Sequence, residues 1–269
     1  MQSARCTPEA GRVKIATWNV NSLRVRLDHL LDWLKAEIPD VVALQETKTV
    51  DENFPVDEIR AAGYRVVFSG QKTYNGVAVL SRGEAGDVVR DLAGLDDPQR
   101  RLLAATVDGV RVINVYVPNG QSVDSEKYLY KLDWLEKLRQ QIAQELERHP
   151  RLVLLGDFNI APEDRDVHDP EAWRGKVLCS PPEREAYRSL IDAGLVDVFR
   201  RFDQPEAEFS WWDYRMNAFR RNLGMRIDLI LASGELAARC TACRVDKGPR
   251  RLERPSDHTL VVAEFTAVD

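Results

Sequence analysis

The chain has 269 residues, of which 44% are hydrophobic and 30% charged, so it is long enough for a sizeable core and ordinary in composition for a globular protein. No apolar stretch approaches the roughly 20 residues that span a bilayer, and residues 1–12 lack the apolar region of a secretory signal, so we expect neither feature. The formal net charge of −5 argues against nucleic acid, but three basic clusters are either solvated loops or parts of a local basic face: 98–101, 219–226 and 248–254.

The four cysteines are too few for a disulfide framework at this length, which favours a reducing cytoplasm. Cys240 and Cys243 have CxxC spacing, but no second pair of cysteine or histidine residues stands at a spacing suitable for zinc. A redox motif opens a helix, whereas the alternating residues 238–245 predict a strand. We interpret both cysteines as structural thiols.

The predicted elements follow one another without a linker, a repeat or a low-complexity tract. Residues 1–12 are predicted to form a disordered extension and 13–269 a single domain. Apolar and β-rich runs bounded by turn residues predict strands over 13–20, 40–46, 64–68, 76–81, 101–107, 110–117, 151–159, 226–233 and 257–265. Apolar residues at spacings of three and four predict helices over 27–37, 126–148 and 183–194, the last with Gly194 as its C-cap.

The mixture of many strands and few helices predicts an α/β fold. Continuous apolar runs are typical of strands that are covered on both faces. We therefore expect two sheets packed on each other, with helices outside them.

Polar side chains terminate one predicted strand after another. Each such residue alone is usually a satisfied cap or turn, because burying a carboxylate costs several kcal/mol unless a cation or a donor compensates for it. Their recurrence at six strand ends predicts that they converge on one site that contains a cation. The residues are Asn19 and Asn21, Glu46, Tyr116 and Asn119, Asp157 and Asn159, Asp228, and Asp257 with His258.

The side chains of this set are rich in oxygen and contain no cysteine. Such ligands select Mg²⁺ or Mn²⁺ rather than zinc, and Mg²⁺ bound by one or two carboxylates is the usual arrangement for phosphate chemistry. His258 is then suited to donate to a phosphate oxygen, with Asp228 holding its ring in one tautomer.

Eight motifs in order resemble the exonuclease III family of class II apurinic/apyrimidinic (AP) endonucleases, within the endonuclease/exonuclease/phosphatase superfamily. They are WNVNSLR (18–24), LQETK (44–48), YNGVAVLSR (74–82), VYVPNG (115–120), GDFNIAP (156–162), WWDYR (211–215), LGMRIDLIL (223–231) and RPSDH (254–258). The resemblance covers residues 13–267 and implies a four-layered α/β sandwich, with two mixed sheets flanked by helices.

The resemblance also implies roles for individual residues. Glu46 matches the principal metal carboxylate, and Asn19, Asp157, Asn159 and Asp257 lie near the metal. Asp157 matches the group that activates the attacking water, and Asn159 the group that orients this water. His258 matches a phosphate-binding histidine and Asp228 its carboxylate partner, while Tyr116 and Asn119 match groups at the scissile phosphate.

The resemblance assigns substrate contacts to the loop 211–225. Trp211, Trp212 and Met225 match the lining of a pocket for an extruded, base-free sugar, although an aromatic patch that packs the loop is the alternative. Asn21 stands where human-type members carry aspartate, which weakens a second metal site there. The positions near the DNA backbone are Asn21, Arg101, Asn119, Lys127, Lys131 and Asn222.

The implied activity is Mg²⁺-dependent hydrolysis of damaged double-stranded DNA by a cytoplasmic monomer with no obligate protein partner. The substrates are DNA with abasic sites, cut on the 5′ side, and DNA with 3′-blocking groups or 3′-terminal nucleotides, as in base excision repair. One alternative is a lipid or inositol phosphodiesterase of the same superfamily, against which the loop 211–225 counts. Another is a non-enzymatic domain, against which the intact metal and general-base positions count.

Overall fold

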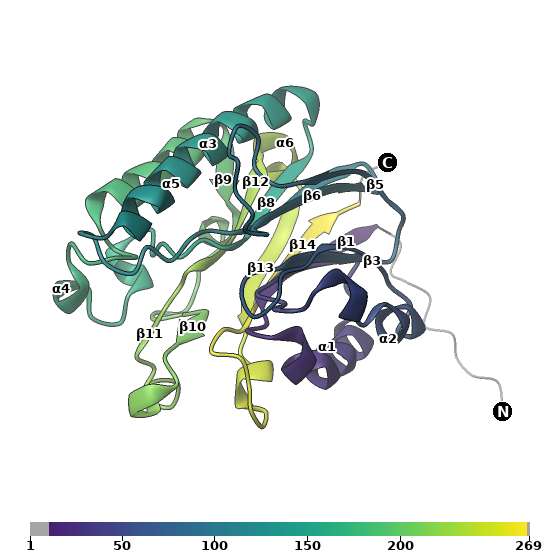
Figure 1. Cartoon of the computed structure of the whole chain (residues 1–269), viewed down its shortest axis with the longest axis horizontal. Helices are drawn as coiled ribbons and strands as arrows, with labels where there is room; N and C mark the ends of the chain where they lie inside the picture. Colours follow the sequence, from purple (N-terminus) through teal and green to yellow (C-terminus); the bar gives the residue numbers. More distant parts are fainter. Residues whose placement is uncertain (1–10, 268–269) are drawn as a thin grey trace.

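The computed structural model describes residues 11–267. Two six-stranded sheets pack face to face, and helices cover the outer face of each sheet (Figure 1). This arrangement confirms the predicted four-layered α/β sandwich. The predicted disordered extension lies almost wholly outside the described residues, and the single domain over 13–269 stays a prediction.

The first sheet has the strand order β13-β14-β1-β2-β4-β3. Its strands β1 and β2 are parallel, so their C-terminal ends lie at the same end of the sheet. Strand β14 is antiparallel to β1 and begins at that end. Its strands are β1 (Arg12–Asn19), β2 (Val41–Gln45), β3 (Arg65–Ser69), β4 (Val77–Ser81), β13 (Cys240–Asp246) and β14 (Leu260–Thr266).

The second sheet has the order β5-β6-β7-β8-β12-β9. It has the same arrangement of strand directions as the first sheet, because β7 and β8 are parallel and β12 runs antiparallel to β8. The ends of β7 and β8 and the start of β12 therefore share one edge. Its strands are β5 (Ala85–Arg90), β6 (Leu102–Val107), β7 (Val110–Tyr116), β8 (Leu152–Asp157), β9 (Leu195–Asp197) and β12 (Asp228–Ser233).

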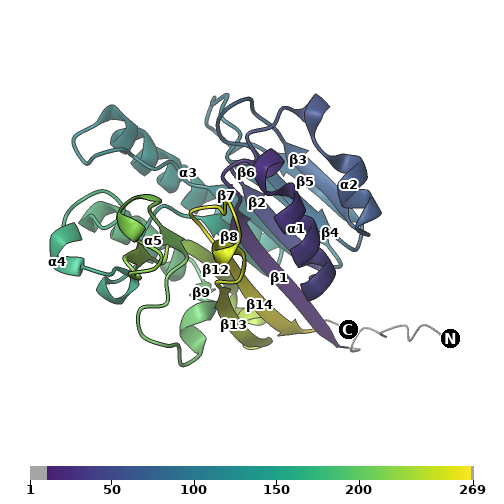
Figure 2. The same cartoon turned by 90° about the horizontal axis from the view of Figure 1, so that it is seen from below.

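The helices complete the outer layers (Figures 1 and 2). In Figure 1, α1 and α2 lie below the first sheet, and α3 and α5 lie above the second. The helices are α1 (Leu23–Glu37), α2 (Val56–Ala61), α3 (Glu126–Arg148), α4 (Pro170–Trp173), α5 (Pro181–Asp192) and α6 (Gly234–Ala238). None of the helices between residues 11 and 267 is both long and apolar enough to cross a membrane.

The alternation of side chains along each strand separates three apolar layers. In β7, Val110 and Val112 face the other sheet, whereas Ile113 and Val115 pack under α3. In β2, Val41 and Ala43 likewise face the other sheet. Both sheets thus have buried faces on both sides, which explains the continuous apolar runs in the sequence.

The structure refines several predicted elements. The helix predicted over 126–148 has the same bounds as α3, while α5 begins earlier than predicted, where Ser180 and Glu183 form a reciprocal capping box. Gly194 follows the end of α5 with φ 112°. The helix predicted over 27–37 begins at Leu23. The elements that were not predicted from the sequence are β5, β9, β10 (Trp211–Trp212), β11 (Gly224–Met225), α2, α4 and α6.

The CxxC cysteines lie on β13, as the alternating pattern predicts. A register irregularity between Cys240 and Ala242 allows both thiols to be buried against the core between the sheets. Cys179, Cys240 and Cys243 are free, and burial raises the pKa of each thiol, so none of the three is a reactive thiolate.

Gly156 allows β8 to approach β7 closely just before Asp157. Its φ is 145°, and a Cβ at this position would lie 1.9 Å from the carbonyl oxygen of Val115. We predict that Gly156→Ala lowers the free energy of unfolding by about 3 kcal/mol or more, because neither the backbone angle nor the space accepts a side chain. Urea denaturation measures this loss. Gly86→Ala is the control, because nothing lies within 4 Å of a Cβ there, and a similar loss in both variants would contradict the prediction.

Candidate active site

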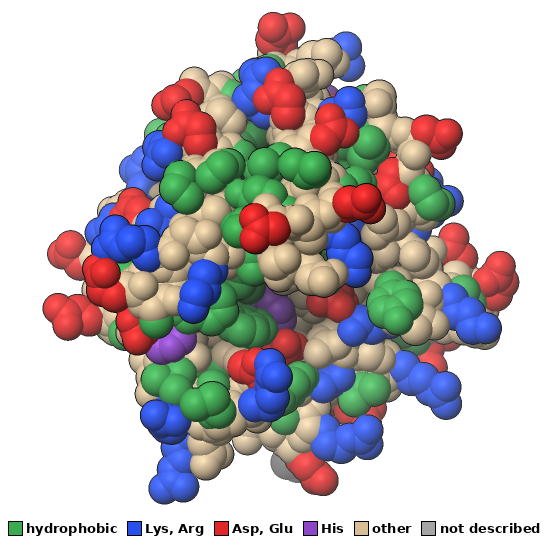
Figure 3. Space-filling model, turned by 60° about the vertical axis from the view of Figure 1, so that its left-hand side comes forward, with side chains coloured by type: hydrophobic (Ala, Val, Ile, Leu, Met, Phe, Trp, Pro, Cys, Tyr) green, Lys and Arg blue, Asp and Glu red, His purple; other side chains and the backbone are tan. Residues whose placement is uncertain are grey.

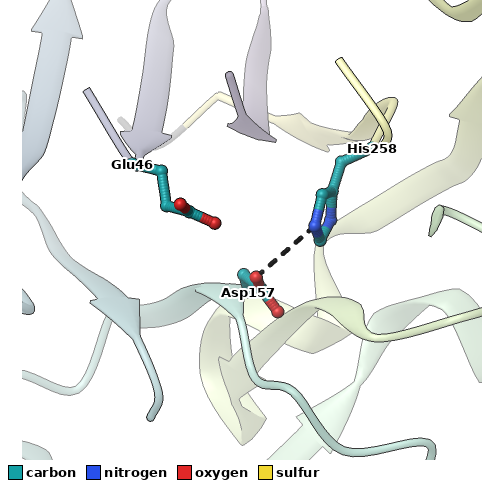
Figure 4. Close-up of side chains that lie close together, drawn as sticks. All are labelled: Glu46, Asp157 and His258. Atoms are coloured by element: carbon teal, nitrogen blue, oxygen red, sulfur yellow. Dashed lines mark ion pairs between the residues drawn. The ribbon is translucent and has the colours of Figure 1, made fainter. Parts of the chain in front are cut away.

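The strand ends of both sheets meet at one place. Glu46, directly after β2, belongs to the first sheet, and Asp157, the last residue of β8, belongs to the second. Both point toward His258, which precedes β14 (Figure 4). One ligand atom from each of these three residues lies within 4.8 Å of the other two. The predicted convergence of distant strand ends is therefore present in the structure.

Asn19 joins the two carboxylates. Its Nδ2 donates to Glu46 Oε1 at 2.8 Å and to Asp157 Oδ2 at 2.9 Å. The backbone N–H of Asn21 donates to Asn19 Oδ1 at 3.0 Å, which fixes the orientation of the amide. The nitrogen rather than the oxygen of Asn19 thus faces the carboxylates, and the placement of Asn19 near the metal stays a prediction.

The backbone turns sharply where the site residues leave their strands. Asn21, Glu46 and Asn159 have φ values of 43°, 50° and 49°, in the left-handed region. Asparagine tolerates this region better than glutamate does, and such conformations cost about 1–3 kcal/mol each and cluster at functional sites. These turns aim the side chains across the edge of the sandwich instead of along the strands.

His258 forms an ion pair with Asp228 behind it. Nδ1 lies 2.9 Å and 3.1 Å from the two carboxylate oxygens, and Nε2 faces Asp157 Oδ2 at 3.7 Å. Burial alone would lower the pKa of His258, but the negative charges of Asp228 and Asp157 outweigh it and raise the pKa to about 10. The ring is therefore an imidazolium at neutral pH, with Nε2–H available as a donor.

Asp157 also has a raised pKa, but here the main cause is burial rather than a neighbouring charge. Burial raises its pKa, and although the positive charge of His258 lowers it, Asp228 adds to the increase, so the pKa stays above its ordinary value. The backbone N–H of Asn159 donates to Asp157 Oδ1 at 2.9 Å and holds the carboxylate in place. A carboxylate with a raised pKa is suited to accept a proton from water.

Asp257 lies beside this cluster on a separate set of donors. Trp211 Nε1 donates to Asp257 Oδ2 at 3.0 Å, and Asn21 Nδ2 donates to Oδ1 at 2.9 Å. Burial alone would raise the pKa of Asp257, but the charge of His258 and these hydrogen bonds hold it below its ordinary value. Asp257 therefore remains ionised.

Tyr116 and Arg101 form the wall next to Glu46. The Arg101 guanidinium carbon lies 4.7 Å from the centre of the Tyr116 ring. Burial, followed by the charges of Glu46 and Asp157, raises the pKa of Tyr116 well above its ordinary value, so its hydroxyl stays protonated as a donor. Lys127, which is also predicted to lie near the DNA backbone, is exposed.

A hollow opens at this wall. It has a volume of about 660 Å³. Figure 3 shows a hollowed face of the molecule with histidine and acidic side chains at its floor and Lys and Arg side chains around it. Residues that line the hollow and that the sequence analysis did not select are Gln71, Tyr74, Asn75, Gln99 and Tyr130. The YNG motif at 74–76 is a signal for Tyr74 and Asn75, and the basic cluster 98–101 contains Gln99.

Lys48 and Arg26 are two further residues that the sequence analysis missed. Lys48 Nζ lies 2.9 Å from Glu46 Oε2. Arg26 donates to the carbonyl oxygens of Asn21 at 2.6 Å and Pro255 at 2.7 Å, and so holds two loops of the site together. Lys48 is part of the quoted LQETK motif, whereas Arg26 lies between the WNVNSLR motif (18–24) and the helix predicted over 27–37 and carries no such signal.

The prediction that Lys131 lies near the DNA backbone is wrong. Lys131 is completely buried, and its Nζ pairs with Glu183, which is also completely buried. The same Nζ donates to the carbonyl oxygens of Asn159 at 2.7 Å and Asn119 at 3.1 Å. Because Asn119 Nδ2 in turn donates to Asn159 Oδ1 at 3.0 Å, Lys131 supports this pair of amides from behind.

The loop 211–225 also differs from the prediction. Trp212 and Met225 are completely buried, so neither lines an open pocket. Trp212 Nε1 donates to Asn222 Oδ1 at 3.1 Å, which ties the half-buried Asn222 to the loop. Of the predicted aromatic pair, only the half-buried Trp211 reaches the site, through Asp257.

The donor set fits a hard divalent cation. Glu46 and Asp157 present carboxylate oxygens across a short gap, and no cysteine is among the site residues. His258 Nδ1 is paired with Asp228, and the raised pKa of the ring favours Nε2 as a donor rather than as a metal ligand. Asn159 can bind a cation only through Oδ1, which accepts from Asn119 Nδ2 at 3.0 Å, and its role at the metal stays a prediction. Glu46 and Asp157 are thus the residues that would hold the ion, with Asp257 nearby.

Comparisons with known proteins agree with this geometry. A model of the endonuclease/exonuclease/phosphatase family matches residues 16–258. Exodeoxyribonuclease III of Haemophilus influenzae is 37% identical over 267 residues, which cover 94% of this chain and 100% of that protein. An exodeoxyribonuclease of Bacillus subtilis is 35% identical over 83% of this chain and 89% of that protein.

Two solved structures are similar throughout. The 3′ phosphatase NExo from Neisseria, bound to a product DNA hairpin, has a TM-score of 0.93 and is 50% identical, covering 94% of this chain and 99% of that one. An AP endonuclease from Archaeoglobus fulgidus has a TM-score of 0.90 at 43% identity, with the same coverage. Together with the fold, these relatives define the class of the protein as a nuclease. The chain belongs to the endonuclease/exonuclease/phosphatase family, in its group of exonuclease III and AP endonuclease enzymes.

The buried position of Lys131 predicts a large effect on stability. Lys131→Met leaves the Glu183 carboxylate buried without its cation, so the free energy of unfolding should fall by about 3–5 kcal/mol. Lys127→Met removes an exposed lysine of the same helix and should change it by no more than about 0.5 kcal/mol. Denaturant unfolding compares the two variants, and equal, small losses would contradict the burial of Lys131.

The ion pair of His258 predicts a shift in titration. Burial lowers the pKa of His258, and Asp228→Asn removes the largest of the charges that raise it, so this pKa should fall from about 10 toward its ordinary value while Asp157 and Asp257 still support the charged ring. NMR of the imidazole nitrogens as a function of pH measures the change. An unchanged His258 pKa in the variant would show that Asp228 does not hold the charge of the ring.

Proposed function

We propose that this protein is a Mg²⁺-dependent DNA repair phosphodiesterase of the exonuclease III type that acts in base excision repair. Its substrates are duplex DNA with 3′-blocking groups or 3′-terminal nucleotides to be removed, and duplex DNA with abasic sites to be cut on the 5′ side. The observation that carries the proposal is the joining of Glu46, Asp157 and a protonated His258 within 4.8 Å at the seam of the two sheets.

Each site residue at the junction of the two sheets has its own role in the proposed mechanism. Bound Mg²⁺ would supply neutralisation of phosphate charge and a more acidic water. Asp157 accepts the proton of the attacking water, and the Asn159 N–H keeps the carboxylate oriented. His258 donates from Nε2 to a phosphate oxygen while Asp228 holds Nδ1. The Tyr116 hydroxyl, kept protonated, is a second donor beside the phosphate.

The loop 211–225 favours 3′-end processing over cleavage at abasic sites. An extruded sugar needs an open pocket, whereas Trp212 and Met225 are completely buried. A 3′-terminal phosphate needs only the open edge where His258 and Glu46 lie. The named activities of similar proteins support this order, since a 3′ phosphatase is 50% identical and an AP endonuclease 43% identical.

Arg101 and Lys127 are proposed to contact the DNA backbone on the hollow side of the site. Both line the 660 Å³ hollow beside Tyr116, and such contacts position the duplex without reading its sequence. They offset the negative net charge locally.

The proposal also includes a monomer in the cytoplasm without an obligate protein partner, and the three free cysteines support a reducing compartment.

Cleavage assays test this function directly. Wild-type protein should release phosphate from a 3′-phosphate duplex faster than it cuts an abasic duplex, and excess chelator should abolish both reactions until Mg²⁺ is restored. Asp157→Asn and His258→Ala should each lower turnover on both substrates about 10²–10⁴-fold. A small phosphodiester serves as the control substrate. Chelator-resistant cleavage, or near-normal turnover of either variant, would contradict the proposal.

A further inference from the structure

A layer of polar side chains lies directly beneath the site, between the two sheets. Thr17, Gln45 and Asn114 are completely buried, and they come from β1, β2 and β7. By the alternation of side chains along a strand, each shares the inner face with apolar neighbours such as Val112 and Ala43. Below this layer the core between the sheets is apolar, and above it the site begins.

The layer connects the inner faces of the two sheets by hydrogen bonds. Gln45 Nε2 donates to Asn114 Oδ1 at 2.7 Å and to Thr17 Oγ1 at 2.9 Å. Asn114 Nδ2 reaches from the second sheet to the carbonyl oxygens of Leu44 and Ala78 in the first, each at 2.9 Å. One amide of the second sheet is therefore tied to two strands of the first.

These bonds are directional, which apolar contacts are not. Two apolar faces can slide past each other with little loss of buried area, because burial depends on area rather than direction. A displaced amide, by contrast, leaves a buried donor or acceptor unpaired, and that costs free energy. Gln45 Oε1 is buried without a hydrogen-bond partner, so the polar layer adds little to the net stability of the fold.

The polar layer lies next to the site, where a shift of one sheet against the other would displace the site residues. Thr17 stands two residues before Asn19, and Asn114 two residues before Tyr116, so each lies on the same face directly below a site residue. Gln45 is bonded in sequence to Glu46. The first sheet carries Glu46 and the second carries Asp157, so the register of the sheets sets the separation of the two carboxylates.

We propose that Gln45 and Asn114 are positioning residues that fix the register of the two sheets and so set the distance from Glu46 to Asp157. The inference rests on the proposed function in that the carboxylate pair holds the catalytic Mg²⁺. It adds that metal affinity is controlled by two buried amides that contact neither the metal nor the DNA.

The test replaces both amides with apolar residues of similar shape, in the double variant Gln45→Met, Asn114→Leu. The double variant removes both partners of the Gln45–Asn114 bond but leaves the carbonyls of Leu44 and Ala78 and the hydroxyl of Thr17 without these donors, so the midpoint of thermal unfolding should fall by several degrees while the protein stays folded. The dissociation constant of Mg²⁺, measured by calorimetry on DNA-free protein, should rise about 10–100-fold, and kcat on the 3′-phosphate duplex should fall by a similar factor. Hydrogen exchange of residues 44–47 without metal should become faster.

The matched control is Val110→Ala, which removes an apolar inner-face side chain at the far end of β7 from the site. It should lower the unfolding midpoint and leave Mg²⁺ affinity and exchange at residues 44–47 unchanged. If the double variant does not fold, Gln45→Met alone carries the test, because Asn114 keeps its bonds to Leu44 and Ala78.

The outcomes separate this inference from the proposed function. A folded variant with wild-type Mg²⁺ affinity and wild-type exchange at residues 44–47 would overturn the inference. A wild-type protein that neither binds Mg²⁺ nor cleaves DNA would overturn the proposed function, and hydrogen exchange would then still decide whether the amides hold Glu46 in place.

Discussion

One amide joins the two halves of this molecule where its chemistry takes place. Asn19 Nδ2 donates to a carboxylate of each sheet, Glu46 in the first and Asp157 in the second. Asp157 is buried and Glu46 half-buried, and two carboxylates this close repel each other and lose hydration, so the pair persists only where donors or a cation compensate. Asn19, Lys48 and His258 provide such compensation around the gap. The rest of the sandwich keeps the two carboxylates together.

The fold was largely predictable because its signals are local and strong. Continuous apolar runs indicate strands buried on both faces, and α3 has an apolar stripe long enough to give its bounds directly. The short elements β9, β10 and β11 carry too few residues for any periodicity, and their conformation depends on tertiary contacts. The packing of sheet on sheet followed from the pattern, but the strand order within each sheet did not.

The convergence of the site residues was predictable from polar residues at strand ends, but their individual environments were not. Lys131 lies on a helix face that a sequence motif cannot distinguish from the DNA side, and it is instead the buried partner of Glu183. Trp212 and Met225 are in a loop whose aromatic residues can line a pocket or pack inward, and here they pack inward. The orientation of Asn19 depends on the N–H of Asn21, whose backbone has a left-handed turn that the sequence does not announce.

The central claim is that carboxylates from the two sheets hold one metal ion between them. Anomalous diffraction from crystals grown with Mn²⁺, a heavier ion for the same oxygen ligands, locates such an ion directly. The account predicts one strong peak at about 2.0–2.3 Å from an oxygen of Glu46, on the side that faces Asp157. A peak bound elsewhere, for instance by Asp257 without Glu46, or no peak at saturating Mn²⁺, would contradict it.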